Sequence, residues 1–464
     1  MKGETLRTRK TWATRLGLLA VVVLLVVASA ATAQRSSAAQ HGVMQAAVQG
    51  HPRYMERINE IANPSGSVHF GCQLTSPPLC YGPDQIRAAY SVQPLLDSGT
   101  NGAGRKIVIV DAYGSPTLVN DLHTWDTVWG VPDPVLDVRT PFGIDSTSVG
   151  NAFGWGVETS LDVEWAHAIA PAAKIVLVVA KSNNDADIVN ALQYAVDNDL
   201  GDVISMSFGE GESCMAAADL AKQHAVFETA KAKNITLFAS SGDQGSAQPA
   251  CDGSPSFFLS ASTPATDPNV TAVGGTNLIA DGVSGAYKSE TTWNETAIFG
   301  PAATGGGLSI LFKRPDYQAP VVKDSHVREV PDVAYNAGIN GGVIVRAFCP
   351  GAVCGGGGGS VYFRVGGTSA GSPQWAGLIA LADQIAGNRV GDVNKTLYHF
   401  GKGGNASAYF HDVTTGNNGL IFVGPGTGTP IAGFSAGSGY DAATGWGTPI
   451  ASTLVPAIAK PGND

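Results

Sequence analysis

Short apolar runs alternate with longer amphipathic segments through the middle of the chain. The runs are continuous, which is typical of strands buried on both faces of a parallel sheet. The segments between them have the length and apolar spacing of helices. This order predicts an α/β fold with a mostly parallel central sheet and helices on both faces. The expected strands are 105–111, 174–180, 202–207 and 235–240, and the expected helices are 157–169, 183–198 and 216–233.

The first residues of the chain have the pattern of a secretory signal peptide. Basic residues precede an uncharged, mostly apolar run over 16–31, which ends at the small-x-small site Ala31-Thr32-Ala33. The alternative is a membrane anchor, but a spanning helix needs about 20 apolar residues and this run is shorter. We therefore expect residues 1–33 to be removed, and a secreted protein without membrane association after cleavage.

Beyond this leader, the sequence changes character at about residue 80. Residues 34–80 are polar and rich in proline and glycine, with one short stretch around 55–61 that is expected to be helical. They are interpreted as a short N-terminal extension and candidate pro-segment. Residues 81–464 are expected to form one globular domain.

The composition excludes several classes of protein. Hydrophobic residues make up 44% of the chain, which excludes wholesale disorder. The formal net charge is −10, and removal of residues 1–33 makes it more negative. An acidic chain argues against nucleic-acid binding, because phosphates require a basic face. Only 14% of the residues are charged, against roughly 25% in typical domains, which favours a compact, glycine-rich protein.

Six cysteines are consistent with an exported protein. Their spacing groups them into nearest neighbours, although six cysteines allow about 15 pairings. We expect the nearest-neighbour disulfides as a hypothesis: Cys72–Cys80, Cys214–Cys251 and Cys349–Cys354.

The segment Gly366-Gly-Thr-Ser369-Ala-Gly-Ser-Pro373 places a serine between a glycine turn and an expected helix. Free N–H groups and the positive end of the helix dipole at such a position suit a nucleophile whose reaction builds an oxyanion. An ordinary helix-capping serine is the alternative. On this pattern alone, the two interpretations of Ser369 stay open.

Two further motifs carry carboxyl groups, one on an expected helix and one at the end of an expected strand. Glu158 and Asp162 are spaced i, i+4 on an expected helix, so they share one face, and their repulsion favours a raised pKa. Asp243 lies in the glycine-rich turn Ser240-Ser-Gly-Asp243 after a strand. Taken singly, a solvated acidic face and a turn aspartate are the simpler interpretations.

Together, these three motifs resemble the sedolisin family, the serine-carboxyl peptidases with a subtilisin-like fold. The similarity extends over roughly residues 80–455 and includes the stretches 161–171, 271–276, 305–309 and 331–333. Subtilisin-like proteases carry a histidine in an HGT-type motif, and none of the nine histidines here lies in one. A glutamate–aspartate pair takes that place.

The resemblance implies a role for each motif residue. Ser369 would be the nucleophile, Glu158 its general base, and Asp162 the group that orients Glu158. Asp243, in its neutral form, would stabilise the oxyanion together with the backbone N–H of Ser369. Because a carboxylate base and a protonated donor must coexist, we expect an endopeptidase that works in acid. Polypeptides would be its substrates, and we expect a monomer.

The resemblance also implies one structural Ca²⁺ near the C-terminus, since carboxylates and carbonyls at glycine-rich turns form a hard-oxygen site. Asp412 and Asp441 would bind through side chains, and Val413, Gly437 and Gly439 through carbonyl oxygens. No other cofactor is expected.

The sequence departs from the family at its N-terminus and leaves two alternatives. Members of the family usually carry a large folded pro-region, whereas only about 45 residues separate the leader from the globular part, so inhibition by a folded propeptide is in doubt. One alternative is a subtilisin-like protease using Asp111, Ser369 and a histidine outside any HGT-type motif, for which His167 is the nearest candidate. The other is a catalytically silent binding protein with the same fold. Asp111 is also a candidate neighbour of the Glu158–Asp162 pair.

Overall fold

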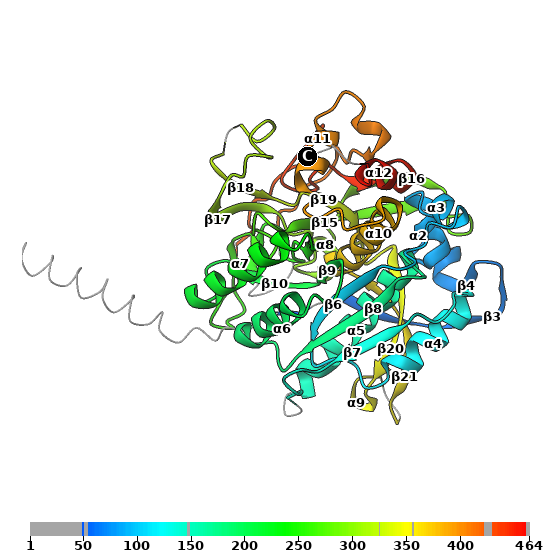
Figure 1. The fold of residues 1–464 in the computed structure, drawn as a ribbon. Coiled ribbons are helices and arrows are strands. Elements are labelled where there is room, and N and C mark those ends of the chain that lie inside the picture. Colours follow the sequence, from blue (N-terminus) through cyan, green and yellow to red (C-terminus); the bar gives the residue numbers. More distant parts are fainter. Residues whose placement is uncertain are drawn as a thin grey trace, which may run out of the picture. The chain divides into compact units, whose positions relative to one another are not determined.

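A computed structural model describes residues 49–50, 54–145, 149–323, 325–354, 357–421 and 429–460 (Figure 1). The predicted signal peptide, residues 1–33, lies outside this part of the chain. None of the helices within the described ranges is both long and apolar enough to cross a membrane.

The centre of the fold is an eight-stranded sheet in the order β16-β15-β11-β9-β6-β8-β7, with β19 also pairing with β15 (Figure 1). Every pairing in it is parallel except that of β15 with β16. The prediction of a mostly parallel central sheet is therefore confirmed. The strands are β6 (Lys106–Ala112), β7 (Leu136–Arg139), β8 (Lys174–Ala180), β9 (Val203–Met206), β11 (Thr236–Ser240), β15 (Thr271–Ala280), β16 (Tyr287–Thr292) and β19 (Val333–Asn336).

Continuous apolar strands are required because the sheet has a core on each side. Successive residues of a strand point to opposite faces. In β6, Ile107 and Ile109 pack into one core cluster, while Val108 and Val110 pack into the other. All four side chains are fully buried. From Ile107 to Val110, the strand therefore has no position at which a side chain would meet water.

Helices cover both faces, as predicted. The long helix α5 (Val149–Ile169) and α10 (Gly371–Ala386) contribute to one core cluster. The helices α6 (Asp185–Asp197) and α7 (Ala217–Ala232) contribute to the other. The second half of α5 is buried on every side, which places its polar residues in the protein interior.

A second sheet has the strand order β2-β21-β20-β5. It includes the stretch around 55–61, for which the sequence predicts a helix. The helix expected around 55–61 is wrong, because β2 (Tyr54–Ile58) pairs antiparallel with β21 (Gly359–Gly366). Pairing with the long strand β21 determines the extended conformation of β2, because pairing and packing outweigh local preference in strands. The other two strands are β20 (Gly342–Cys349) and β5 (Cys80–Tyr81).

The remaining strands form small sheets at the periphery. One of them has a bearing on the site, because β1 (Gln49–Gly50) and β14 (Ser262–Thr263) flank β10 (Phe208–Gly211) on its two edges, both antiparallel. The other pairs are β3 (Glu60–Ser65) with β4 (Val68–Phe70), β12 (Ala247–Pro249) with β13 (Phe257–Leu259), β17 (Gly307–Lys313) with β18 (Val327–Val330), and β22 (Phe410–His411) with β23 (Thr448–Pro449).

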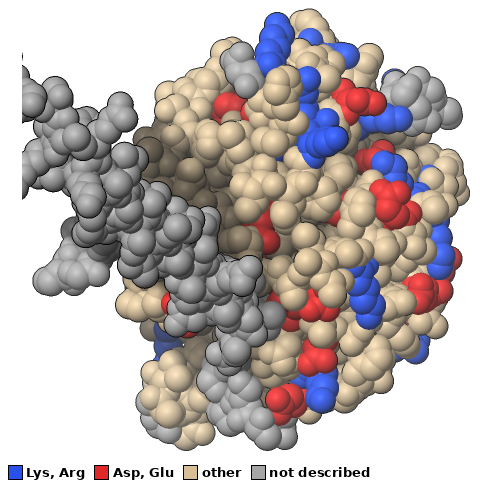
Figure 2. Space-filling model, turned by 90° about the vertical axis from the view of Figure 1, so that its left-hand side faces the viewer, with Lys and Arg blue, Asp and Glu red and all other residues tan. Residues whose placement is uncertain are grey.

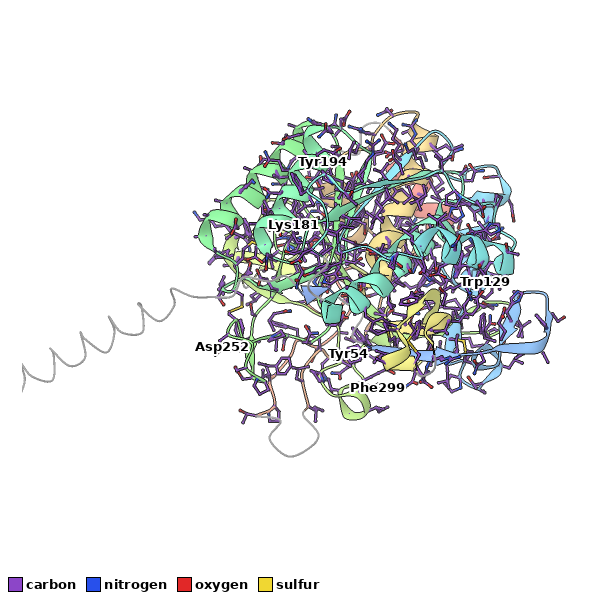
Figure 3. All side chains as sticks on the ribbon, turned by 90° about the horizontal axis from the view of Figure 1, so that it is seen from below. Tyr54, Trp129, Lys181, Tyr194, Asp252 and Phe299 are labelled. Carbon is purple, nitrogen blue, oxygen red and sulfur yellow. A yellow bond between two sulfur atoms is a disulfide. The ribbon has the colours of Figure 1, made fainter. Side chains whose placement is uncertain are left out.

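Shorter helices complete the fold around the two sheets. Tyr54 and Phe299, at the end of α8, both pack against a small core cluster that contains the buried Trp293, and Figure 3 shows the two side chains near each other. These helices are α2 (Pro83–Ala89), α3 (Gln93–Asp97), α4 (Leu118–Trp129), α8 (Thr296–Phe299), α9 (Gly351–Cys354), α11 (Asn394–Gly401) and α12 (Ala451–Ile458).

The three expected disulfides are all present: Cys72–Cys80, Cys214–Cys251 and Cys349–Cys354. The low charge of the composition is visible on the surface. Figure 2 shows basic and acidic side chains interspersed on a mainly uncharged face.

Candidate active site

Ser369 lies where β21 ends and α10 begins. Gly367 and a single 3-10 turn, Thr368–Ala370, make the connection. Gly367 has φ +136°, and a Cβ there would lie 2.7 Å from Asp243 Oδ2, so both conformation and space require glycine. The turn leaves Ser369 fully buried just before the N-terminus of the helix. This is the position that the sequence predicted for a nucleophile.

Glu158 and Asp162 lie one turn apart on the buried part of α5, and both side chains are fully buried. Burial and the neighbouring Asp162 raise the pKa of Glu158 well above its usual value, while the Ser369 hydroxyl lowers it. Neither Glu158 nor Ser369 Oγ makes a hydrogen bond of standard geometry, so the two groups are close without being locked together. The structure thus brings the predicted base to the predicted nucleophile.

Asp162 is in contact with two groups that the sequence patterns did not place in the catalytic set. Burial and the nearby Asp111 raise the pKa of Asp162, and the Ser207 hydroxyl lowers it. Burial raises the pKa of Asp111 to about 7, against a smaller opposing effect of the Thr159 hydroxyl. Asp111 therefore adjoins the carboxyl pair at the carboxyl end of β6, where ligands gather in open α/β sheets.

Ser207 interacts both with Asp162 and with the backbone of the predicted nucleophile, Ser369. Besides acting on Asp162, its hydroxyl donates to the backbone carbonyl of Ser369 at 3.3 Å. No local pattern assigns Ser207 a catalytic role, because that role depends on the residue after β9 meeting the 3-10 turn Thr368–Ala370 in space. Its place at the end of a strand beside Phe208 was the only available signal.

Asp243 follows β11 and reaches the turn that carries the nucleophile. Its Oδ1 accepts hydrogen bonds from the backbone N–H and the hydroxyl of Thr368, both at 2.8 Å. It is fully buried and lies close enough to Glu158 for an ionised Asp243 to raise the pKa of Glu158. The four predicted catalytic residues, Ser369, Glu158, Asp162 and Asp243, are thus brought together in the interior.

His167 makes its contacts with Pro132 and Asp126. It is fully buried near the end of α5, and its Nε2 lies 2.9 Å from the carbonyl oxygen of Pro132 and 3.3 Å from Asp126 Oδ1. Nine residues separate it from Glu158, which is about 13 Å along a helix. This geometry disfavours the alternative in which Asp111, His167 and Ser369 form a triad.

The residues expected to hold Ca²⁺ converge on one loop cluster. Asp441 accepts hydrogen bonds from the backbone N–H groups of Gly437, Ala443 and Thr444, and Asp412 accepts one from Gly439. The hydroxyl of Thr444 joins Asp441 to the carbonyl of Val413. Within the described residues, no cluster of three or more His, Cys, Asp or Glu side chains could hold a metal. A site here would therefore depend on backbone carbonyls beside the two carboxylates, a donor set that suits Ca²⁺.

Comparison with known proteins identifies the family of the chain. A model of the subtilase family, Peptidase S8, matches residues 150–396, which is more than half of the chain. The chain belongs to this family. Among curated relatives, kumamolisin from Bacillus sp. (strain MN-32) is 33% identical over 392 residues, covering 82% of this chain and 64% of the relative. Sedolisin from Pseudomonas sp. (strain 101) is 29% identical over 363 residues, covering 73% and 58%.

A solved structure of Pseudomonas sedolisin, a serine-carboxyl proteinase complexed with two molecules of pseudo-iodotyrostatin, superposes with a TM-score of 0.68 at 27% identity. The match covers 81% of this chain and 97% of that chain. The subtilisin-like fold and the resemblance to the sedolisin family are confirmed. The chain spans about three fifths of the length of the two curated relatives named above.

Proposed function

We propose that this protein is an acid-acting serine-carboxyl endopeptidase that hydrolyses polypeptides through an acyl-enzyme on Ser369. The meeting of Glu158 with the Ser369 hydroxyl in a buried site carries the proposal. Membership in the family supports it. A silent binding protein with this fold is the weaker alternative, because all four expected catalytic positions are filled.

In the proposed reaction, Glu158 accepts the proton of Ser369 as Oγ attacks the scissile carbonyl carbon. Asp162 holds Glu158 in orientation. The negative charge on the former carbonyl oxygen is stabilised by the protonated Asp243 and the backbone N–H of Ser369. Collapse breaks the C–N bond, and Glu158 returns the proton to the leaving amine. Water then attacks the acyl-enzyme by the same route and releases Ser369.

The proposed activity requires acid because a carboxyl group serves as a hydrogen-bond donor. Asp243 can donate a hydrogen bond to an oxyanion only while it carries a proton. The buried carboxyls around Glu158 have raised pKa values, so protons are shared among them rather than all lost in mild acid. We therefore expect activity in acid that is lost as the pH rises.

The same proposal includes the remaining expectations. Residues 1–33 would direct secretion, in line with the disulfides. Residues 34–80 would act as a short pro-segment, and the mature protein would be monomeric. One Ca²⁺ would be held by the Asp412 and Asp441 carboxylates and the carbonyls of Val413, Gly437 and Gly439, where it would stabilise the loops.

Casein digestion at pH 4 tests the function directly. The wild type should digest casein, whereas Ser369→Ala and Glu158→Ala of equal folded content should not. Ser372→Ala is a matched control, because Ser372 is a buried serine of the same helix start that bonds to Ser205 instead. Digestion by Ser369→Ala equal to that of the wild type would reject the proposal.

A further inference from the structure

Two carboxyl groups outside the proposed catalytic set lie together beside β10. Asp185 is the first residue of α6 and Glu210 is the third residue of β10, with only 1% and 6% of their surfaces exposed. Both Asp185 carboxylate oxygens and Glu210 Oε1 are buried, and among the described residues no N–H or hydroxyl group donates to them with standard geometry; the two carboxyl groups interact with each other. In Figure 3, Lys181 marks the end of β8, from which the chain turns into α6.

This acid pair has no basic partner among the described groups that act on it. Burial raises the pKa of Asp185 to about 6 and that of Glu210 to about 9. After burial, the main influence on Glu210 is Asp185 itself, and Asp219 of α7 raises both pKa values. The pair therefore retains a proton in place of a cation. Two carboxylates so close repel each other, and this repulsion opposes ionisation of both.

The neighbouring charged groups are already engaged elsewhere. Asp187 of α6 accepts a hydrogen bond from Ser182, and Glu212, just after β10, binds Ser309 and the backbone N–H of Ile310. Lys222 of α7 donates to Asn190 rather than to the pair. Among the described residues, no basic side chain acts on the pair, so a bound partner could supply its cation.

The edge of β10 beside this pair accepts an extended chain. In the structure, β1 lies on it antiparallel, with Gln49 opposite Gly209 and Gly50 opposite Phe208. Continuing this register towards the N-terminus of an added strand sets its next residue opposite Glu210. Residues directly opposite each other in an antiparallel pair project their side chains on the same face.

The register also determines which substrate residue lies opposite Glu210. Ser207, the residue before β10, bonds to the carbonyl of Ser369, so a peptide residue opposite Ser207 lies at the nucleophile. A substrate that takes the place of β1 on this edge, in the same register, would then have the residue before its scissile bond opposite Ser207. Counting back along the antiparallel strand, its fourth residue before the scissile bond lies opposite Glu210.

We propose that Asp185 and Glu210 form a subsite for a Lys or Arg side chain at the fourth substrate residue before the scissile bond. This inference rests on the proposed peptidase function. The ammonium or guanidinium group replaces the shared proton, which passes to solvent, and it donates hydrogen bonds to both carboxylates. Because Asp185 loses its proton as the pH approaches 6, the preference for a cation rises between pH 4 and pH 6.

Two quenched-fluorescence peptides that differ only at this residue test the subsite, one with Lys and one with the uncharged norleucine of similar length. For the full-length wild type, the ratio of their kcat/KM values should be about tenfold in favour of Lys at pH 6 and smaller at pH 4. Glu210→Gln should bring the ratio close to one at both pH values. Asp187→Asn, which removes an acid from the same helix turn, should leave the ratio unchanged.

Equal hydrolysis of both peptides by the wild type at pH 6 overturns the subsite while leaving the peptidase function standing. A ratio that persists in Glu210→Gln also overturns it. If neither peptide is hydrolysed, the proposed function fails, and equilibrium binding of the two peptides to Ser369→Ala decides the subsite. Tighter binding of the Lys peptide at pH 6 supports it, and equal binding rejects it.

Discussion

Asp243 Oδ1 accepts both the backbone N–H and the hydroxyl of Thr368, each at 2.8 Å. Thr368 directly precedes Ser369, so these two bonds fix the carboxyl group to the turn that carries the proposed nucleophile. The absence of a side chain at Gly367 leaves room for the other carboxylate oxygen. An acid held in this way can act on the same oxyanion as the backbone N–H of Ser369.

Substitution of Asp243 should therefore separate hydrogen-bond donation from structural support. Asp243→Ala should lower kcat about 10²- to 10³-fold, as removal of an oxyanion donor does. Asp243→Asn keeps an acceptor for Thr368 and donates at any pH, so it should retain more activity and extend it to higher pH. The pH profile of kcat for both variants checks this. An unchanged upper pH limit in Asp243→Asn would contradict the donor role.

Glu158 and His167 distinguish the two possible bases. Glu158→Gln cannot accept a proton and should lose about 10²- to 10⁴-fold in kcat. His167→Gln keeps a polar group towards Pro132 and should retain kcat per folded molecule, even if its Tm falls. Peptide hydrolysis at pH 4, normalised to folded protein by circular dichroism, measures both. Loss of activity in a folded His167→Gln would instead favour a histidine-dependent mechanism.

The buried carboxyls should make the protein more stable in acid than at neutral pH. Burial raises the pKa of Asp111 and Asp383 to about 7 in the folded state. A group whose folded pKa is raised contributes its full stability below the unfolded pKa, near 4, and loses it as the pH rises through the folded pKa. Tm should therefore fall between pH 4 and pH 8.

Asp383 offers a test of this cause away from the proposed catalytic residues. Its Oδ1 accepts the backbone N–H of Val390, a bond that asparagine can keep. A rise in pKa from about 4 to about 7 corresponds to about 4 kcal/mol, so Asp383→Asn should clearly narrow the difference in stability between pH 4 and pH 8. Thermal unfolding of wild type and variant across this range measures it. An identical pH dependence would show that Asp383 is not a source of the effect.

Removal of Ca²⁺ should destabilise the C-terminal loops. A bound ion at a hundredfold excess over its Kd contributes about 2.7 kcal/mol, so a chelator should lower Tm and excess Ca²⁺ should restore it. Asp441→Asn should lose the bound metal, as measured by elemental analysis. Asp252→Asn, at an exposed turn labelled in Figure 3, is the control and should keep it. A metal-free wild type indifferent to chelator would reject the site.

Much of the fold follows from local pattern. The strand that became β8 was predicted to the residue, and the helices that became α6 and α7 were predicted within two residues at either end. These elements are buried on one or both faces, and their buried positions must be apolar. The spacing of apolar residues in the sequence therefore shows the type and extent of each element. The stretch around 55–61 failed because β21 supplies the hydrogen bonds that determine its conformation. A pairing partner some 300 residues away leaves no local signal.

The sequence by itself determined the motifs of the site: the serine at a helix start, the i, i+4 carboxyl pair, the turn aspartate and the nearest-neighbour disulfides. Each depends on contacts within a few residues or on an ordered set of motifs. Only the tertiary structure decided that Asp111 and Ser207 adjoin Asp162, and that Asp185 and Glu210 meet beside the edge of β10. These groups come from different strands and helices, and their pKa values depend on burial and on neighbours that folding alone brings together.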